Sequence, residues 1–129
     1  MTGYLLDTHA ALWWWTDSPK LGPSVRALID GDDDRIYLSA ASIWEIAVKA
    51  HAGRLPEIPR FRDEYPGLME ANRFELIAMT DRHVLKAAYL EGTHRDPFDR
   101  VIAGQALCED LIVLTRDPEI SGFGCKVLW

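Results

Sequence analysis

Residues 35–52, RIYLSAASIWEIAVKAHA, place a short strand directly before a long helix. The first four residues have the composition of a strand, and Ser39 has the side chain of a helix N-cap. The apolar run that follows predicts a helix as far as Ala52, which Gly53 ends. The same succession of a short strand and a longer helix recurs on both sides of this stretch.

The flanking segments extend this alternation over the whole chain. Helices are expected at residues 8–15, 25–29, 81–90 and 97–109, with a weaker helix through residues 69 and 71 that Pro66 disturbs. Further strands are expected at residues 4–6, 74–79, 111–114 and, at an edge, 126–129. Strands separated by helices of this length form right-handed βαβ units. We therefore predict a three-layer α/β/α fold with a central parallel sheet of about five strands.

The size and composition are those of an ordinary globular protein. A length of 129 residues suits one domain, 1–129, and 48% hydrophobic with 26% charged residues excludes disordered and fibrous classes. The longest apolar run, from Ala10 to Trp15, is too short to span a membrane. Asp7 interrupts the only candidate signal peptide. Cys108 and Cys125 are too few for a disulfide framework, so we expect a cytoplasmic protein with reduced thiols.

The net charge limits how the protein can bind a polyanion such as nucleic acid. There are 14 basic and 20 acidic residues, which gives a net charge of −6. A protein that holds nucleic acid by bulk electrostatics is usually basic. This chain therefore either binds no polyanion or recruits cations to do so.

Five acidic residues fall at equivalent places in the predicted fold. Asp7 and Asp117 follow strands, Glu45 lies in the helix after the second strand, and Asp96 and Asp99 open the helix before the fourth. Ligands bind beyond the carboxyl ends of strands in an open parallel sheet. Clustered carboxylates repel one another unless they are protonated or bind a metal. Several carboxylates suit Mg²⁺ or Mn²⁺ rather than zinc.

A structural explanation of these acids stands beside the functional one. Helix N-termini favour Asp, so Asp7, Asp96, Asp99 and Asp117 could each be a helix cap. Glu45 could pair with the lysine four residues later, Lys49. Capping does not explain a glutamate inside an apolar run, nor four elements that each bring a carboxylate to one rim.

Four segments carry a family resemblance: LLDTHA (5–10), LSAASIWEI (38–46), HRDPFDRVIA (94–103) and LTRD (114–117). In order and spacing they resemble PIN-domain ribonucleases, and within that family the VapC-type toxins of toxin–antitoxin pairs. The resemblance implies that Asp7, Glu45, Asp99 and Asp117 are the catalytic, metal-binding quartet. Asp96 matches a nearby acidic position with a supporting role.

The resemblance also implies an activity and partners. The expected function is Mg²⁺- or Mn²⁺-dependent endoribonuclease activity, in which a metal-activated water hydrolyses RNA phosphodiester bonds. The expected partners are the RNA substrate, a second copy of the chain in a homodimer, and an antitoxin that lays an apolar segment along the toxin. No membrane association is expected.

Several residues beside the acids are candidates for supporting roles. Arg95, Arg100 and Arg116 could contact the substrate's phosphates, although Arg100 could instead form a structural ion pair. Thr115 could orient a carboxylate or a water through its hydroxyl, or form an ordinary strand-end hydrogen bond. His9 lies near the acids.

Other histidines and the tryptophans are less specific signals. His94 also lies near the acids, but four carboxylates need no histidine ligand; His51 and His83 are expected to face solvent. In the run of tryptophans at residues 13–15, successive helical positions point about 100° apart. At least one ring should therefore be partly exposed, as a partner surface or a platform for base stacking.

Two other functions fit part of the pattern. A receiver-like Mg²⁺-binding signalling domain has strand-end acids, but it needs paired acids after the first strand, where Asp7 stands alone. It also needs a lysine at the end of the last strand, whereas Lys126 begins it. A non-catalytic PIN scaffold that binds RNA or protein is the second alternative, and the intact acids argue against it.

Overall fold

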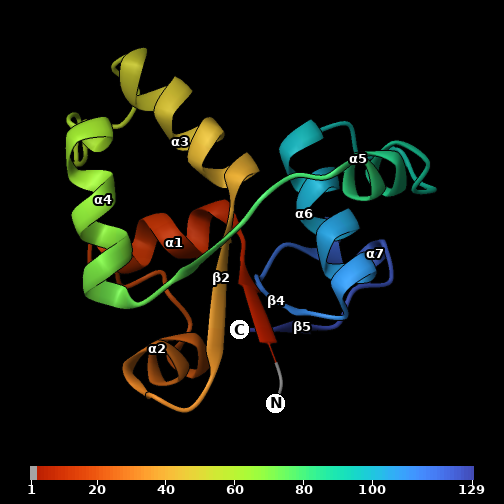
Figure 1. Cartoon of the computed structure of the whole chain (residues 1–129), viewed down its shortest axis with the longest axis horizontal. Coiled ribbons are helices and arrows are strands. Elements are labelled where there is room, and N and C mark those ends of the chain that lie inside the picture. The colour runs from red at the N-terminus through yellow and green to blue at the C-terminus, as the bar shows by residue number, and fades with distance from the viewer. Residues whose placement is uncertain (1–2) are drawn as a thin grey trace.

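The computed structural model describes residues 3–129, and its centre is a five-stranded sheet between two layers of helices (Figure 1). The strand order is β3-β2-β1-β4-β5, and every neighbouring pair is parallel. The predicted parallel sheet of about five strands is confirmed. The strands are β1 (Gly3–Leu6), β2 (Arg35–Ser39), β3 (Glu75–Ile77), β4 (Ile112–Leu114) and β5 (Val127–Leu128).

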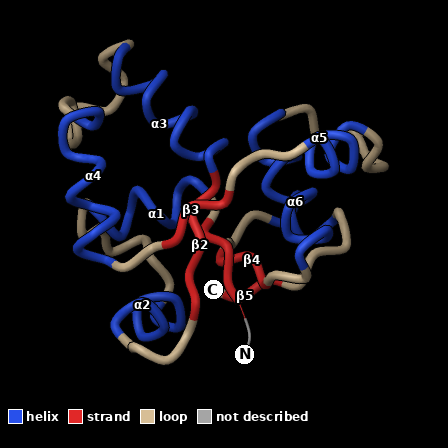
Figure 2. Tube along the Cα trace, in the orientation of Figure 1, coloured by secondary structure: helices blue, strands red, loops and turns tan. Residues whose placement is uncertain are grey.

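Helices cover both faces of the sheet (Figures 1 and 2). Leu6 of β1 packs with Val25 in one apolar cluster, whereas Leu5 packs with Ile102 in another. Successive strand residues point to opposite faces, so the two clusters are the cores of the two helical layers. One layer holds α1 (Thr8–Trp15), α2 (Pro23–Asp30), α3 (Ala40–His51) and α4 (Phe61–Asn72); the other holds α5 (Asp81–Ala88), α6 (Pro97–Glu109) and α7 (Pro118–Gly122).

The boundaries differ from the expected ones for local reasons. β3 ends at Ile77 rather than at residue 79, because its partner β2 ends at Ser39 and offers no further backbone to pair with. α2 begins earlier than expected, since Gly22 is its N-cap and Pro23 takes the first helical position. Pro66 lies inside α4, and the helix continues through it.

The carboxyl ends of β1 and β4 mark the place where the chain changes direction. After β1 the chain passes to β2 and β3 on one side, whereas β4 leads to β5 on the other side. The Asp7 N–H donates to the Leu114 carbonyl at 3.2 Å, so the two strand ends lie side by side. Ligands of open parallel sheets bind at such a switch point.

Within residues 3–129, no helix combines the length and the apolar character needed to cross a bilayer.

Candidate active site

Asp7 is buried at the end of β1, and both of its carboxylate oxygens have donors. The residue is 6% exposed and is the N-cap of α1, where one oxygen accepts from the Ala10 N–H at 2.6 Å. The other oxygen accepts from the Thr115 hydroxyl at 2.5 Å. Burial raises the pKa of Asp7, and these hydrogen bonds oppose the rise.

Thr115 connects two of the predicted site residues. Its hydroxyl oxygen, besides donating to Asp7, accepts from the Asp117 N–H at 3.0 Å. Asp117 is in turn the N-cap of α7 and accepts from the Glu119 N–H at 2.9 Å. A single buried hydroxyl therefore fixes the spacing between the residues that follow β1 and β4.

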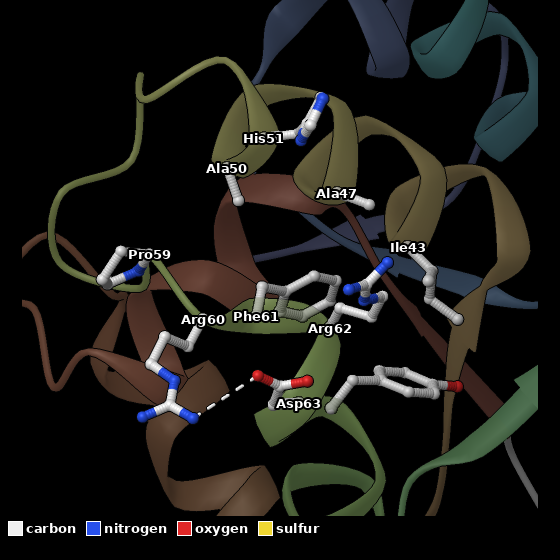
Figure 3. A pocket seen from close by; sticks show the side chains of 10 residues that line it. Ile43, Ala47, Ala50, His51, Pro59, Arg60, Phe61, Arg62 and Asp63 are labelled. Carbon is white, nitrogen blue, oxygen red and sulfur yellow. Dashed lines mark ion pairs between the residues drawn. The ribbon is translucent and has the colours of Figure 1, made fainter.

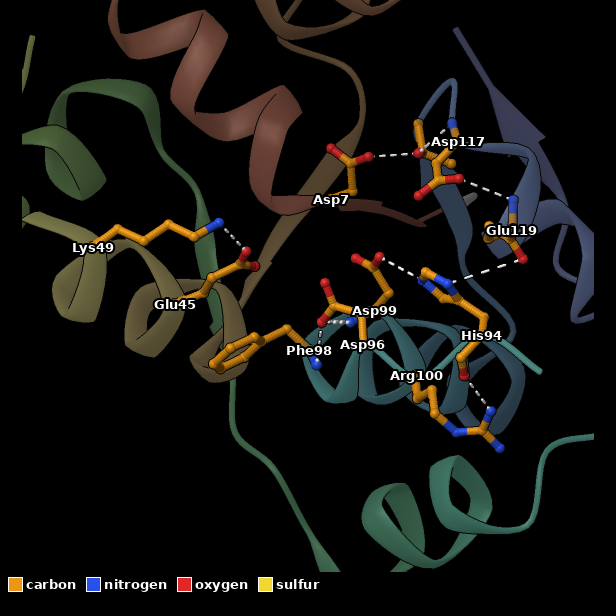
Figure 4. Close-up of polar contacts among 11 residues, drawn as sticks. Asp7, Glu45, Lys49, His94, Asp96, Phe98, Asp99, Arg100, Asp117 and Glu119 are labelled. Carbon is orange, nitrogen blue, oxygen red and sulfur yellow. Dashed lines mark hydrogen bonds and ion pairs between the residues drawn. The ribbon is translucent and has the colours of Figure 1, made fainter. Parts of the chain in front are cut away.

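Asp99 lies in the first turn of α6 but does not cap it. Asp96 is the N-cap, with an oxygen that accepts from the Phe98 N–H at 2.9 Å and from the Asp99 N–H at 3.4 Å. The Asp99 carboxylate is thereby left to face His94, whose Nε2 lies 2.8 Å away (Figure 4).

The electrostatics of Asp99 reflect burial and crowding by other acids. The pKa of Asp99 is raised from 3.8 to about 6. Burial is the largest cause, the charges of Asp96, Asp117 and Glu45 add to the rise, and the hydrogen bond from His94 opposes it. The hydrogen bond to Asp99 is the first cause of a raised pKa for His94. The carboxylate is thus held where its negative charge is disfavoured.

Glu45 approaches this group from α3. It is 5% exposed, and its Oε2 lies 2.6 Å from the Lys49 Nζ. The ion pair considered for these two residues in the sequence is therefore present. Lys49 neutralises part of the charge of Glu45, yet that charge still contributes to the raised pKa of Asp99.

The close-up shows how these acids lie relative to one another. The carboxyl groups of Asp7, Asp99 and Asp117 turn toward one space, and Glu45 lies on its other side (Figure 4). His94, Asp99 and Asp117 offer ligand atoms that all lie within 4.8 Å of one another. Asp7 lies outside this close group, although the charge of Asp117 raises its pKa.

Capping explains part of this arrangement. Asp7, Asp96 and Asp117 are helix N-caps, as the structural explanation predicted. Asp99 is not a cap, and its pKa is raised by burial and, in addition, by its acidic neighbours. A divalent cation would relieve this repulsion, and carboxylate oxygens are the donors that Mg²⁺ prefers. The residues present therefore fit such an ion.

Arg100 has a structural role within the chain. Its guanidinium donates to the carbonyls of Ala87 (3.0 Å), His94 (2.8 Å) and Leu90, and lies 5.2 Å from the Phe123 ring centre. The sequence suggested either a substrate phosphate or a carboxylate as the partner of Arg100. In the structure its hydrogen-bond partners are backbone carbonyl oxygens. By holding the His94 carbonyl, Arg100 fixes the loop that brings this histidine to Asp99.

The other arginines and histidines divide between surface and interior. Arg95 is exposed in the loop before α6, and Arg116 is exposed after β4. His51 is exposed, as expected. The expectation that His83 faces solvent is wrong: it is 3% exposed. Gly104 explains this burial, because it lets α6 approach so closely that a Cβ there would lie 2.8 Å from the His83 carbonyl oxygen.

His94 is the site residue that the sequence underrated. The sequence offered four carboxylates, so a histidine ligand was not expected. In the structure His94 hydrogen-bonds to the carboxylate of Asp99. Its Nδ1 also lies 3.9 Å from Glu119 of α7. The available signal was its position in the loop that leads to Asp96 and Asp99.

The sequence matches the PIN domain over residues 4–124. The chain belongs to the PIN-domain family, and the PIN-like fold predicted from its motifs is confirmed. The receiver alternative is wrong: receivers have the strand order 2-1-3-4-5, whereas this sheet has the order 3-2-1-4-5. No protein of curated function matches the sequence.

Solved structures of toxin–antitoxin complexes share this fold at low identity. DNA-bound VapBC from Salmonella typhimurium is 20% identical, with a TM-score of 0.76 over 99% of this chain and 98% of that chain. VapBC2 from Rickettsia felis, bound to a promoter DNA fragment, is 14% identical, with a TM-score of 0.71 over 97% and 96%. FitAcB from Neisseria gonorrhoeae is 21% identical, with a TM-score of 0.69 over 98% and 96%. The chain is therefore a PIN domain that resembles VapC toxins.

Proposed function

We propose that this protein is a metal-dependent endoribonuclease and the toxin of a toxin–antitoxin pair. The observation that carries the proposal is the half-buried carboxylate of Asp99, which caps no helix and whose charge is disfavoured by partial burial and by neighbouring acids. Folding does not need this arrangement, whereas a hydrolase that binds a divalent cation does.

The quartet of Asp7, Glu45, Asp99 and Asp117 would hold Mg²⁺ or Mn²⁺. When bound, the ion would lower the pKa of a water and stabilise negative charge on phosphate oxygens. The chain supplies the positioning. Thr115 fixes the carboxylate of Asp7, His94 and Lys49 fix those of Asp99 and Glu45, and Asp96 caps the helix that carries Asp99. Such outer partners set the orientation of ligating side chains.

Although the protein is acidic, a few arginine side chains near the acids would bind the RNA substrate. Arg95 and Arg116 are exposed on the loops that carry the acids, and their guanidinium groups suit phosphate oxygens. Arg100 donates to three backbone carbonyls, so we assign it a structural role instead. The protein would act as a single domain. Its location would be the cytoplasm, where cellular RNA is available for cleavage.

The antitoxin would occupy a groove between α3 and α4 (Figure 3). This cavity of about 510 Å³ has an apolar wall that includes Ile43, Ala47 and Phe61, and Arg60 and Arg62 lie beside it. Its chemistry suits an apolar segment with a flanking acidic residue. The solved VapBC and FitAcB structures support a protein partner for this fold.

A homodimer would bury exposed apolar side chains of α5, of its C-cap residue and of the edge strand β3. Leu76, Leu85 and Tyr89 are 54%, 59% and 83% exposed. Exposed apolar side chains of this size are candidates for a protein interface. Sedimentation analysis of the wild type and of a Tyr89→Glu variant tests this, since a monomeric wild type would contradict it.

The decisive experiment is RNA cleavage by the purified protein. Total RNA and short single-stranded RNA should be cut in Mg²⁺ or Mn²⁺, remain intact in EDTA, and be cut again when the metal is restored. Asp99→Asn should remove the activity. Asp33→Asn, in an exposed turn, is the matched control and should retain it.

Binding without cleavage would indicate a different function. RNA that is bound but remains intact with a folded wild type and added metal would favour the non-catalytic PIN scaffold. Cleavage that survives thorough chelation would contradict the metal-dependent mechanism.

A further inference from the structure

A second cavity opens directly beside the acidic cluster. Its volume is about 360 Å³, near the lower end of the roughly 300–1,000 Å³ of small-ligand pockets. Two of its walls are candidate active-site acids, so a group bound there would touch the reacting part of a substrate. The lining residues are Asp7, His9, Trp13, Arg116, Asp117 and Pro118.

Another wall of the cavity is formed by the guanidinium of Arg116, which packs against aromatic rings. The Arg116 guanidinium lies 4.6 Å from the Trp13 ring centre and 5.9 Å from that of Trp129, and the two rings meet edge to face at 5.8 Å. The His9 ring lies 5.4 Å from Trp13. Among residues 3–129, Arg116 makes no ion pair within 4.0 Å, so stacking on Trp13 rather than a carboxylate holds its charge in place.

Trp13 differs from the two tryptophans that follow it. Trp14 Nε1 donates to the Asn72 side chain at 2.7 Å, and Trp15 packs against Phe61 and Phe74. These two rings therefore join α1 to the α4 side of the molecule. Trp13 instead contacts Trp129 and Arg116 and lines the cavity. Of the two sequence-based explanations for an exposed ring, a base-stacking platform fits its position beside Asp7.

We propose that this cavity holds one nucleobase of the RNA, from a nucleotide next to the bond that is cut. Arg116 and Trp13 would be the positioning and specificity residues. Bases stack on aromatic rings and on guanidinium planes, and a guanidinium can also donate to a base edge or a phosphate. A base can enter only when it is unstacked and unpaired, so the substrate class is single-stranded RNA or a loop. This inference rests on the proposed function.

The test removes the base and the guanidinium separately. The cut site in a short single-stranded RNA is mapped first, and then substrates with an abasic nucleotide on either side of the cut are made. Arg116→Lys keeps the positive charge but removes the planar guanidinium group, and Trp13→Leu removes the indole ring. Arg35→Lys, at the opposite end of the sheet, is the matched control. Thermal unfolding checks that each variant is folded.

Arg116→Lys and Trp13→Leu should each raise KM about tenfold on the intact RNA, in line with the loss of one stacked base. One of the two abasic substrates should show the same rise with the wild type. On that substrate the two variants should then cause little further loss. Equal effects of the variants on intact and abasic RNA would overturn the proposal, as would an unchanged KM.

The outcome separates this inference from the proposed function. A wild type that cuts RNA, with variants that have no base-dependent effect, retains the nuclease and rejects the base site. If the wild type does not cut, titration with the four nucleoside monophosphates tests the cavity directly. Binding that Arg116→Lys weakens about tenfold would support it, and no binding would reject it. Variants that lose only affinity for a protein partner would assign this face to that partner and also reject it.

Discussion

Replacing Asp99 by Asn should stabilise the metal-free protein at neutral pH. The substitution keeps the shape of the side chain, and its amide oxygen can still accept a hydrogen bond from His94. One pKa unit corresponds to about 1.4 kcal/mol, so the rise from 3.8 to about 6 costs the folded protein about 3 kcal/mol when Asp99 is ionised. The Asn variant is free of this cost.

The sign and the pH window follow from the raised pKa. The folded state holds the Asp99 proton more tightly than the unfolded state, so the wild type loses stability as the pH rises from about 4 through about 6. The advantage of the variant should therefore be close to zero near pH 4 and approach about 3 kcal/mol above pH 7. The opposing hydrogen bond from His94 is already part of the pKa of about 6, so its loss is already contained in this difference.

Urea unfolding in EDTA at pH 4 and pH 7.5 measures this difference, with Asp33→Asn as the control. Millimolar Mg²⁺ should then stabilise the wild type and not the Asp99→Asn variant, because a ligand that binds the folded state alone stabilises it. A variant that is equally or less stable at pH 7.5, with a gap that does not change with pH, would refute the electrostatic reasoning.

Three further substitutions test the supports of the site. Thr115→Val removes the hydroxyl that joins Asp7 to Asp117, and cleavage measured at saturating Mg²⁺ should fall about 10–100-fold while the fold persists in circular dichroism. Arg100→Met leaves three carbonyls without their donor and should lower the free energy of unfolding in urea by about 1–3 kcal/mol; a neutral result would contradict its structural role. Gly104→Ala forces a Cβ to 2.8 Å from the His83 carbonyl and should cost about 1–3 kcal/mol in the same assay, unless α5 and α6 can separate freely.

The order of elements and the place of the acids were predictable from the sequence. Asp7 directly follows β1, Ser39 ends β2, and Asp117 lies shortly after β4. Residues of these types begin helices, and each is the N-cap of the helix that follows. These signals are local, and the right-handed βαβ rule turns them into a parallel sheet. Since all strands then end at one edge, the convergence of Asp7 and Asp117 follows without knowledge of any side-chain contact.

Only the tertiary structure decided what each side chain does. The loop at residues 89–96 brings His94 to Asp99, and Arg100 takes three carbonyls as partners, because α5 and α6 pack closely across Gly104. The same packing buries His83. Which of three adjacent tryptophans reaches the acids depends on how α1 is rotated over the sheet. Sequence patterns specify where a helix begins and which face is apolar, but the distance and rotation between two helices come from packing across the whole core.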